Sequence, residues 1–192
     1  MSENAVFKDV KDVIAIIKTG RDYLSPIRLQ KALYFLFAYY GATYGSIPNS
    51  ESEDNRMSEV DNDSYPKYLF NEYNGEEIQF EAWQYGPVIR KIYTANKEGK
   101  FENLTFDEGK YKNNTFIKDV ILFMNGIMEE LDSMSDFSLV DRSHQDYAWR
   151  SKFDFDNPYK NSEINKDELI KEYANALKED SKIWWIKIAF QN

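Results

Sequence analysis

The chain contains a single histidine, and its surroundings offer the clearest candidate for chemistry. His144 stands in the stretch LVDRSHQDYAW, with Asp141 and Asp146 as candidate orienting partners and Ser143 as a candidate nucleophile. A histidine that takes a proton from a serine while a carboxylate holds the ring is the arrangement of nucleophilic catalysis. Neighbours along a helix seldom face one another, so we favour a structural histidine that caps a helix end or bonds a buried backbone group.

The remaining inventory of reactive groups is poor. The chain has no cysteine, which excludes disulfides, thiolate catalysis and cysteine-ligated zinc. An all-carboxylate site for calcium or magnesium would remain, but the acidic stretch at 54–63 lacks the glycine and the spacing of an EF-hand loop. The eight glycines are scattered singly, so no segment resembles a phosphate-binding loop. We therefore expect no catalytic set, no cofactor and no metal.

The charge balance bears on the choice of partner. The formal net charge is −9, which repels nucleic-acid phosphates and would steer a basic protein toward the chain. Arg90, Lys91 and Lys97 form the one cluster of helical cations that favours nucleic acid, and we judge it too weak. For Arg28 and Lys31 we expect the stems to pack on a buried face while the charged heads reach water.

No stretch has the 18 or so consecutive apolar residues of a membrane span, and the first residues lack the pattern of a signal peptide. The sequence therefore predicts a cytoplasmic protein without a membrane partner.

Helical periodicity dominates the chain. Apolar residues recur at helical spacing in six segments: 6–17, 26–40, 87–96, 120–131, a short stretch from Ser135, and 166–178. Ser25 is the expected N-cap of the second helix, with Pro26 at its first position, and Asn165 is the expected cap of the last. We expect the second helix to be the most buried, because its apolar face is broad.

A smaller part of the chain has the alternation of a strand. Residues 78–83 alternate apolar and polar side chains, and Asn74-Gly75 favours a tight hairpin that pairs them with 68–73. The predicted fold is therefore mainly α, a compact helical domain with a small β-hairpin or minor antiparallel sheet. An acidic, aperiodic insertion is expected at 46–68, within a single domain at 1–182, followed by an aromatic C-terminal tail at 183–192.

Three stretches together resemble one known family. LSPIRLQKALYFLFAYYGATYG resembles its opening helix, and FEAWQYGPVIRKIY resembles its motif of an acidic residue followed by Ala-Trp-x-x-Gly-Pro-Val and a later tyrosine. LVDRSHQDYAWRSKF resembles its third element, Ser/Thr-His-x-x-x-x-Trp. The family is the Panacea domain, the SocA-like antitoxins, also found as phage-associated proteins of the GepA type. The resemblance runs from about residue 24 to residue 177.

The resemblance implies a helical fold and a role as the neutralising partner of a toxin, one that the adjacent gene would encode. It carries no established catalytic residues. The expected mechanism is stoichiometric binding, with an acidic, tyrosine-rich face covering the working surface of the toxin. Two alternatives stay open: a phage-borne adaptor or effector that binds a host protein such as a protease, and an uncharacterised enzyme that uses His144.

The motif residues have two interpretations of their own. In the first, Gly86 and Pro87 form a strand-to-helix corner, held by aromatic side chains, that serves the architecture. In the second, an aromatic pocket holds a small ligand or a toxin side chain. The candidate partner-binding residues are Trp83, Tyr85, Gly86, Pro87, His144 and Trp149.

Overall fold

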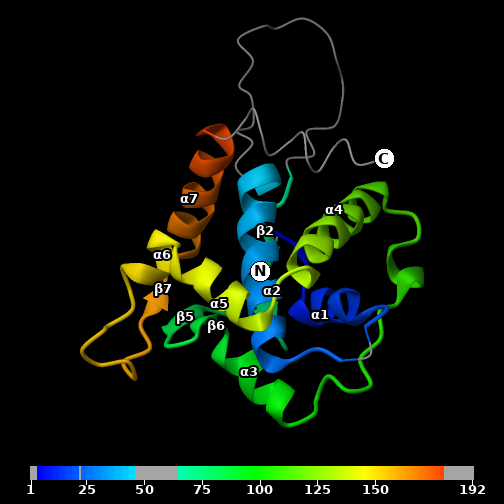
Figure 1. Ribbon diagram of the computed structural model, residues 1–192. Helices are drawn as coiled ribbons and strands as arrows, with labels where there is room; N and C mark the ends of the chain where they lie inside the picture. The colour runs from blue at the N-terminus through cyan, green and yellow to red at the C-terminus, as the bar shows by residue number, and fades with distance from the viewer. Residues whose placement is uncertain (1–3, 22, 46–64, 180–192) are drawn as a thin grey trace, which may run out of the picture.

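The computed structural model describes residues 4–21, 23–45 and 65–179, and helices account for most of them (Figure 1). This confirms the predicted class, mainly α with minor sheets. The α-helices are α1 (Val10–Lys18), α2 (Pro26–Tyr40), α3 (Arg90–Lys97), α4 (Thr115–Asp132), α5 (Asp136–His144), α6 (Tyr147–Arg150) and α7 (Lys166–Glu179). A π-helical turn, η1 (Gly41–Gly45), extends α2, and a 3₁₀ turn, η2 (Glu108–Tyr111), precedes α4.

The strands are short and form three small sheets. They are β1 (Ala5–Phe7), β2 (Tyr68–Phe70), β3 (Glu72–Tyr73), β4 (Glu76–Glu77), β5 (Phe80–Trp83), β6 (Gly86–Val88) and β7 (Glu163–Ile164). β1 pairs with β2 in parallel, β3 pairs with β4 antiparallel, and β5 lies between β6 and β7 with antiparallel pairing to both.

Helix α2 is the axis of the molecule (Figure 1). In that view α1 and α4 lie to one side of it and α5, α6 and α7 to the other, while β5 and β6 lie near its lower end. Eleven of its fifteen residues are buried, from Leu29 to Ala38 without interruption and again at Tyr40. A helix that is enclosed on all sides in this way holds the core together, as the sequence predicts for this segment.

The predicted local signals at helix ends and turns are confirmed. The Oγ of Ser25 accepts a hydrogen bond of 3.0 Å from the N–H of Arg28, and Pro26 occupies the first position of α2. Asn165 caps α7 in the same manner. Asn74 and Gly75 have φ angles of 52° and 79°, the left-handed pair that a two-residue hairpin requires.

The strand pairing that was predicted for that hairpin, between 78–83 and 68–73, is wrong. The Asn74-Gly75 turn joins β3 to β4, whereas β5 pairs with β6 and with β7, a strand 80 or more positions away in sequence. Of the predicted insertion at 46–68, only 65–68 lie within the described residues, and Tyr68 already belongs to β2. The tail at 183–192 lies outside them, so the division into a domain at 1–182 and a tail stays a prediction.

Two predicted helix starts are also wrong. Val6 lies in β1, and α1 begins only at Val10, where the carboxylate of Asp9 caps it. Pro87 does not begin a helix but lies in β6, and α3 begins at Arg90. In both cases the apolar residues before the helix are used in strand pairing, which periodicity within one segment cannot reveal.

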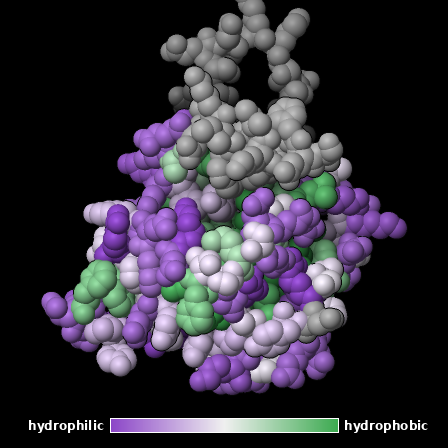
Figure 2. Space-filling model, viewed as in Figure 1, coloured by the Kyte–Doolittle hydropathy of each residue, from purple (hydrophilic) through white to green (hydrophobic). Residues whose placement is uncertain are grey.

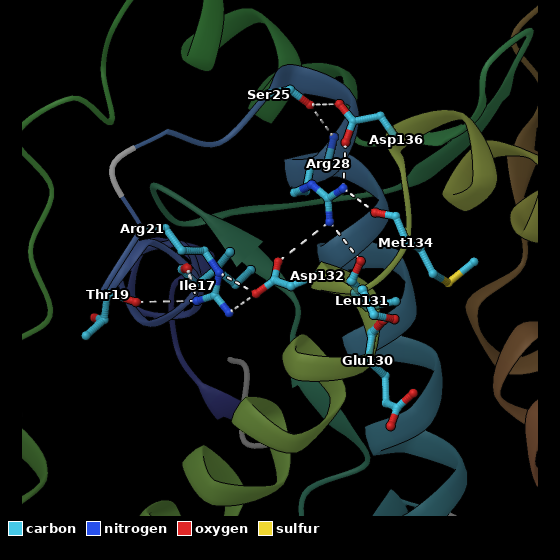
Figure 3. A network of polar contacts seen from close by, with 11 residues as sticks. Ile17, Thr19, Arg21, Ser25, Arg28, Glu130, Leu131, Asp132, Met134 and Asp136 are labelled. Atoms are coloured by element: carbon cyan, nitrogen blue, oxygen red, sulfur yellow. Dashed lines mark hydrogen bonds and ion pairs between the residues drawn. The ribbon is translucent and has the colours of Figure 1, made fainter.

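Arg28 fastens the start of α2 to the end of α4 (Figure 3). Its guanidinium donates hydrogen bonds of 2.8 Å to the carbonyl of Leu131, in the last turn of α4, and of 2.6 Å to the carbonyl of Met134, just beyond the end of that helix. It also forms an ion pair of 2.9 Å with Asp136. The side chain is 16% exposed, so the expectation that its charged head reaches water is wrong: the fork is used to satisfy the carbonyls at a helix end.

The surface in the view of Figure 2 is mostly hydrophilic, with several separate apolar patches, one of which lies over α4. No helix within the described ranges is long and apolar enough to cross a membrane.

Candidate functional site

The three motif segments meet at one buried junction beside α2. The first contributes Gln30 and Lys31 on α2, the second contributes the β5–β6 turn, and the third contributes the end of α5 and α6. Contacts of α2 with β6, of α2 with α5 and of α5 with β6 bring them together. Segments separated by more than 50 positions in sequence are therefore fastened to one another here.

Lys31 is buried at the centre of this junction. Its side chain is 1% exposed, and Nζ donates a hydrogen bond of 2.9 Å to the carbonyl of Pro87. The neighbouring Gln30 accepts a hydrogen bond of 2.8 Å from the N–H of Ile89. Removal from water disfavours the charged amine and lowers the pKa of Lys31 to about 7. The expectation that its head reaches water is wrong, because α2 is covered on every side.

Gly86 allows strand β6 of the second motif to pack closely against α2 and α5. Its φ angle is +85°, a conformation that side chains with a Cβ rarely adopt. A Cβ there would also lie closer than 3.0 Å to the Oγ of Ser143 and 2.8 Å from the Nζ of Lys31. The glycine is thus required both by the backbone angle and by the packing of α2 and α5 against β6.

His144 and Trp149 form the aromatic part of the junction. Their rings stack with centroids 4.0 Å apart, and the Nε1 of Trp149 donates a hydrogen bond of 3.0 Å to the carbonyl of Trp83. Burial lowers the pKa of His144 and the charge of Lys31 lowers it further, against the opposing effect of Asp141. At neutral pH the imidazole is therefore uncharged, as suits a ring packed on an indole.

The candidate partner-binding residues do not all face one place. The ring of Trp83 packs against Tyr93 and beneath the guanidinium of Arg90, away from Trp149, and Trp149 reaches only the backbone of Trp83. Tyr85, beyond the end of β5, is 57% exposed. Gly86, Pro87 and Trp149 are buried in the junction, and His144 is partly buried. The structure brings the set into one neighbourhood without aiming the side chains at a common point.

The candidate catalytic partners of His144 are engaged elsewhere. Ser143 donates its hydroxyl proton to the carbonyl of Val140 at 2.8 Å. Asp146 accepts hydrogen bonds of 2.6 Å from Arg142 and 2.8 Å from the hydroxyl of Tyr173. Among these described residues no hydrogen bond joins His144 to Ser143, Asp141 or Asp146, although the charge of Asp141 acts to raise the pKa of the imidazole. The hydrogen-bonded arrangement of a general base with its orienting carboxylate is therefore not assembled.

Sequence reasoning missed the network around Asp146. This carboxylate is 3% exposed, and its ion pair with Arg142 and its bond to Tyr173 fasten α5 to α7. Glu172 of α7 accepts hydrogen bonds of 2.6 Å and 2.9 Å from the first backbone N–H groups of α6. The i, i+4 spacing of Arg142 and Asp146 is a signal for their ion pair that the sequence contains. No local pattern indicates that the hydroxyl of Tyr173 also bonds to Asp146.

The contacts of the junction hold the three motif segments together. Most of its polar groups bond to one another, but the Nε2 of His144 is buried and has no hydrogen-bond partner among the described residues. Within the described ranges, no group of three or more His, Cys, Asp or Glu side chains lies close enough to hold a metal ion.

The fold and this junction define a small helical domain in which three separated motifs interlock around one central helix. The chain belongs to the family described as antitoxin SocA-like, Panacea domain, whose model matches residues 29–150, more than half of the chain. The match contains all three motif centres, Lys31, Gly86 and Trp149. Comparison with curated proteins and with solved structures found no match to the chain.

Proposed function

We propose that this chain neutralises a toxin by binding it directly as a folded protein, and that the toxin is encoded by the adjacent gene. The observation that carries the proposal is membership of the SocA-like antitoxin family. The geometry supports it, because the motif residues make contacts with one another inside the fold. A scaffold fixed in this way leaves its outer surface for contact with a partner.

The arrangement around His144 also favours binding over catalysis. Ser143 and Asp146, two of the three candidate partners of His144, are instead bonded to Val140, Arg142 and Tyr173. The proposed site of action is the cytoplasm, since a chain without cysteine needs no oxidising compartment.

The test is co-expression of this chain with the product of the neighbouring open reading frame in a host whose growth that product arrests. We expect growth to be restored and the two proteins to elute together from a sizing column. The His144→Ala variant should also restore growth, because neutralisation uses no general base. Toxicity that persists beside the folded wild-type chain, with no complex formed, would contradict the proposal. Recovery of a host protease instead, in a pull-down, would favour the adaptor alternative.

A further inference from the structure

Aromatic side chains gather at the surface where η1 meets α4. The centre of the Tyr44 ring, in η1, lies 5.4 Å from that of Phe123 and 5.6 Å from that of Tyr65. The ring of Tyr65 lies 5.1 Å from that of Phe116. We call these four side chains the aromatic face. Tyr65 is 47% exposed and the other three are partly exposed, so the face provides large, rigid contact area to a partner.

One carboxylate lies within the aromatic face. Asp119 is exposed and stands three residues after Phe116 and four before Phe123, a spacing that puts all three on one flank of α4. In Figure 1 the upper end of α2, which η1 continues, lies beside α4. Burial raises the pKa of the Tyr44 hydroxyl and the charge of Asp119 raises it further, so this carboxylate acts directly on the tyrosine.

Elsewhere in the chain a tyrosine and an aspartate are joined by a cation. The tyrosine hydroxyl donates a hydrogen bond to the aspartate, and a lysine both pairs with that aspartate and lies over the tyrosine ring. Such triads are Lys110–Tyr111–Asp12 and Lys67–Tyr68–Asp167. The lysine lies 5.0 Å from the ring centre in the first triad and 5.2 Å in the second. In both, the cation offsets the charge of the carboxylate and is attracted by the ring.

The aromatic face has the ring and the carboxylate of such a triad without the cation. Within the part of the chain that the structure describes, no ion pair involves Asp119, and no lysine or arginine lies over the ring of Tyr44 or Tyr65. Lys118 is the neighbour of Asp119 in sequence, but it lines a groove between α4 and α1, on the other flank of α4. The described residues therefore leave the charge of this face unpaired.

We propose that the aromatic face binds an arginine-bearing segment of the toxin, whose guanidinium lies over the tyrosine rings and pairs with Asp119. The inference rests on the proposed function. A guanidinium suits both groups, because it is planar enough to stack on a ring and forms two parallel bonds to a carboxylate. Arg90 of this chain does both: it lies 5.0 Å from the ring centre of Trp83 and donates two hydrogen bonds to Glu81. The formal net charge of −9 steers a basic segment toward the chain.

A second copy of this chain fits the aromatic face less well. A symmetric dimer places the same surface of both copies together, so the unpaired Asp119 of one copy would approach that of the other. A segment that brings its own cation removes this repulsion. The aromatic face is therefore assigned as the centre of the contact with the toxin, with a polar rim around it.

The first test measures binding of the purified product of the neighbouring open reading frame to charge-reversed variants. We expect Asp119→Lys to weaken the dissociation constant by at least tenfold, because it places an ammonium against the guanidinium of the partner. Glu129→Lys is the matched control: Glu129 is also exposed on α4, and its reversal changes the net charge by the same amount. The control should stay within about twofold of the wild type. Equal melting temperatures will show that both variants are folded.

The second test removes the ring. Tyr65→Ala should weaken binding by about tenfold, whereas Tyr65→Phe, which keeps the ring, should stay within about twofold of the wild type. Tyr159→Ala is the control for loss of an exposed tyrosine, since Tyr159 is 84% exposed and lies outside the aromatic face. It should also bind as the wild type does.

The outcomes separate this inference from the proposed function. If the wild type neither binds nor neutralises the neighbouring product, the proposed function fails and this inference with it. If the wild type binds and both Asp119→Lys and Tyr65→Ala bind equally well, the assignment of the aromatic face alone is overturned. Equal weakening by Asp119→Lys and Glu129→Lys would show that only the net charge matters and would overturn it too. A wild-type chain that is dimeric on its own, and monomeric as Tyr65→Ala, would assign the face to a second copy and contradict the proposal.

Discussion

Between pH 7 and pH 9 the free energy of unfolding is expected to rise by about 2 kcal/mol from the titration of Lys31 alone. The pKa of this amine is about 7 in the folded chain and close to 10.4 when the chain is unfolded. Across this window the unfolded state binds the additional proton, so stability rises with pH. The cost of burying the charge is largest at and below pH 7, and it disappears as pH approaches the unfolded pKa.

Urea unfolding at a series of pH values measures this effect. The window stops at pH 9 because several buried tyrosines, among them Tyr40 and Tyr173, have raised pKa values and would lower stability at higher pH. In Lys31→Met an apolar side chain of similar length replaces the amine. The rise of about 2 kcal/mol in the free energy of unfolding between pH 7 and pH 9, which is expected for the wild type, should be absent in this variant. Lys171→Met, at an exposed position on α7, is the control and should keep the wild-type slope. Equal slopes for the wild type and Lys31→Met would show that Lys31 is not titrating in the junction.

The second large effect is expected at Gly86. Replacement by alanine should lower the free energy of unfolding by about 2 to 5 kcal/mol. Roughly 1 to 2 kcal/mol comes from the φ angle of +85°, and the remainder from forcing a Cβ against Ser143 and Lys31. Neither neighbour can withdraw to solvent, because both are buried.

Gly75 offers a matched control for that variant. Its φ angle is +79°, yet a Cβ there would meet no atom within 4 Å. Gly75→Ala therefore carries the backbone strain alone and should cost about 1 to 2 kcal/mol. The difference between the two variants in urea unfolding isolates the packing of the junction. Equal losses would mean that Gly86 is needed only for its backbone angle. If Gly86→Ala does not fold while Gly75→Ala does, the packing cost at Gly86 is large enough to exceed what remains of the free energy of unfolding.

The elements predicted correctly are those whose signals are local. Ser25 and Asn165 cap their helices, and Asn74-Gly75 turns the chain, because each acts within four residues of its own position. Val6 and Pro87 were assigned to helices wrongly, because their strand partners lie far away in sequence. The short β7 was not predicted, because a strand of two residues is too short to show an alternating pattern.

The residues of the three motifs lie in one neighbourhood, but their role in binding a partner stays a prediction. The burial of Lys31 was not predicted, because a lysine on an apolar helix usually extends to water and only tertiary contacts reveal that α2 is enclosed. The aromatic face between η1 and α4 was not predicted either, since its rings come from segments that lie far apart in sequence. The acidic, tyrosine-rich binding face stays a prediction.

The central claim is that this chain acts by occupying a surface of its toxin and not by converting anything. The most direct measurement titrates the activity of the purified neighbouring product with increasing amounts of this chain. Stoichiometric binding predicts that activity falls in a straight line and ends at a fixed molar ratio, and that it returns when the complex is unfolded and the toxin is refolded alone. Loss of activity at a small fraction of that ratio, which persists after this chain is removed, would reveal turnover and contradict the claim.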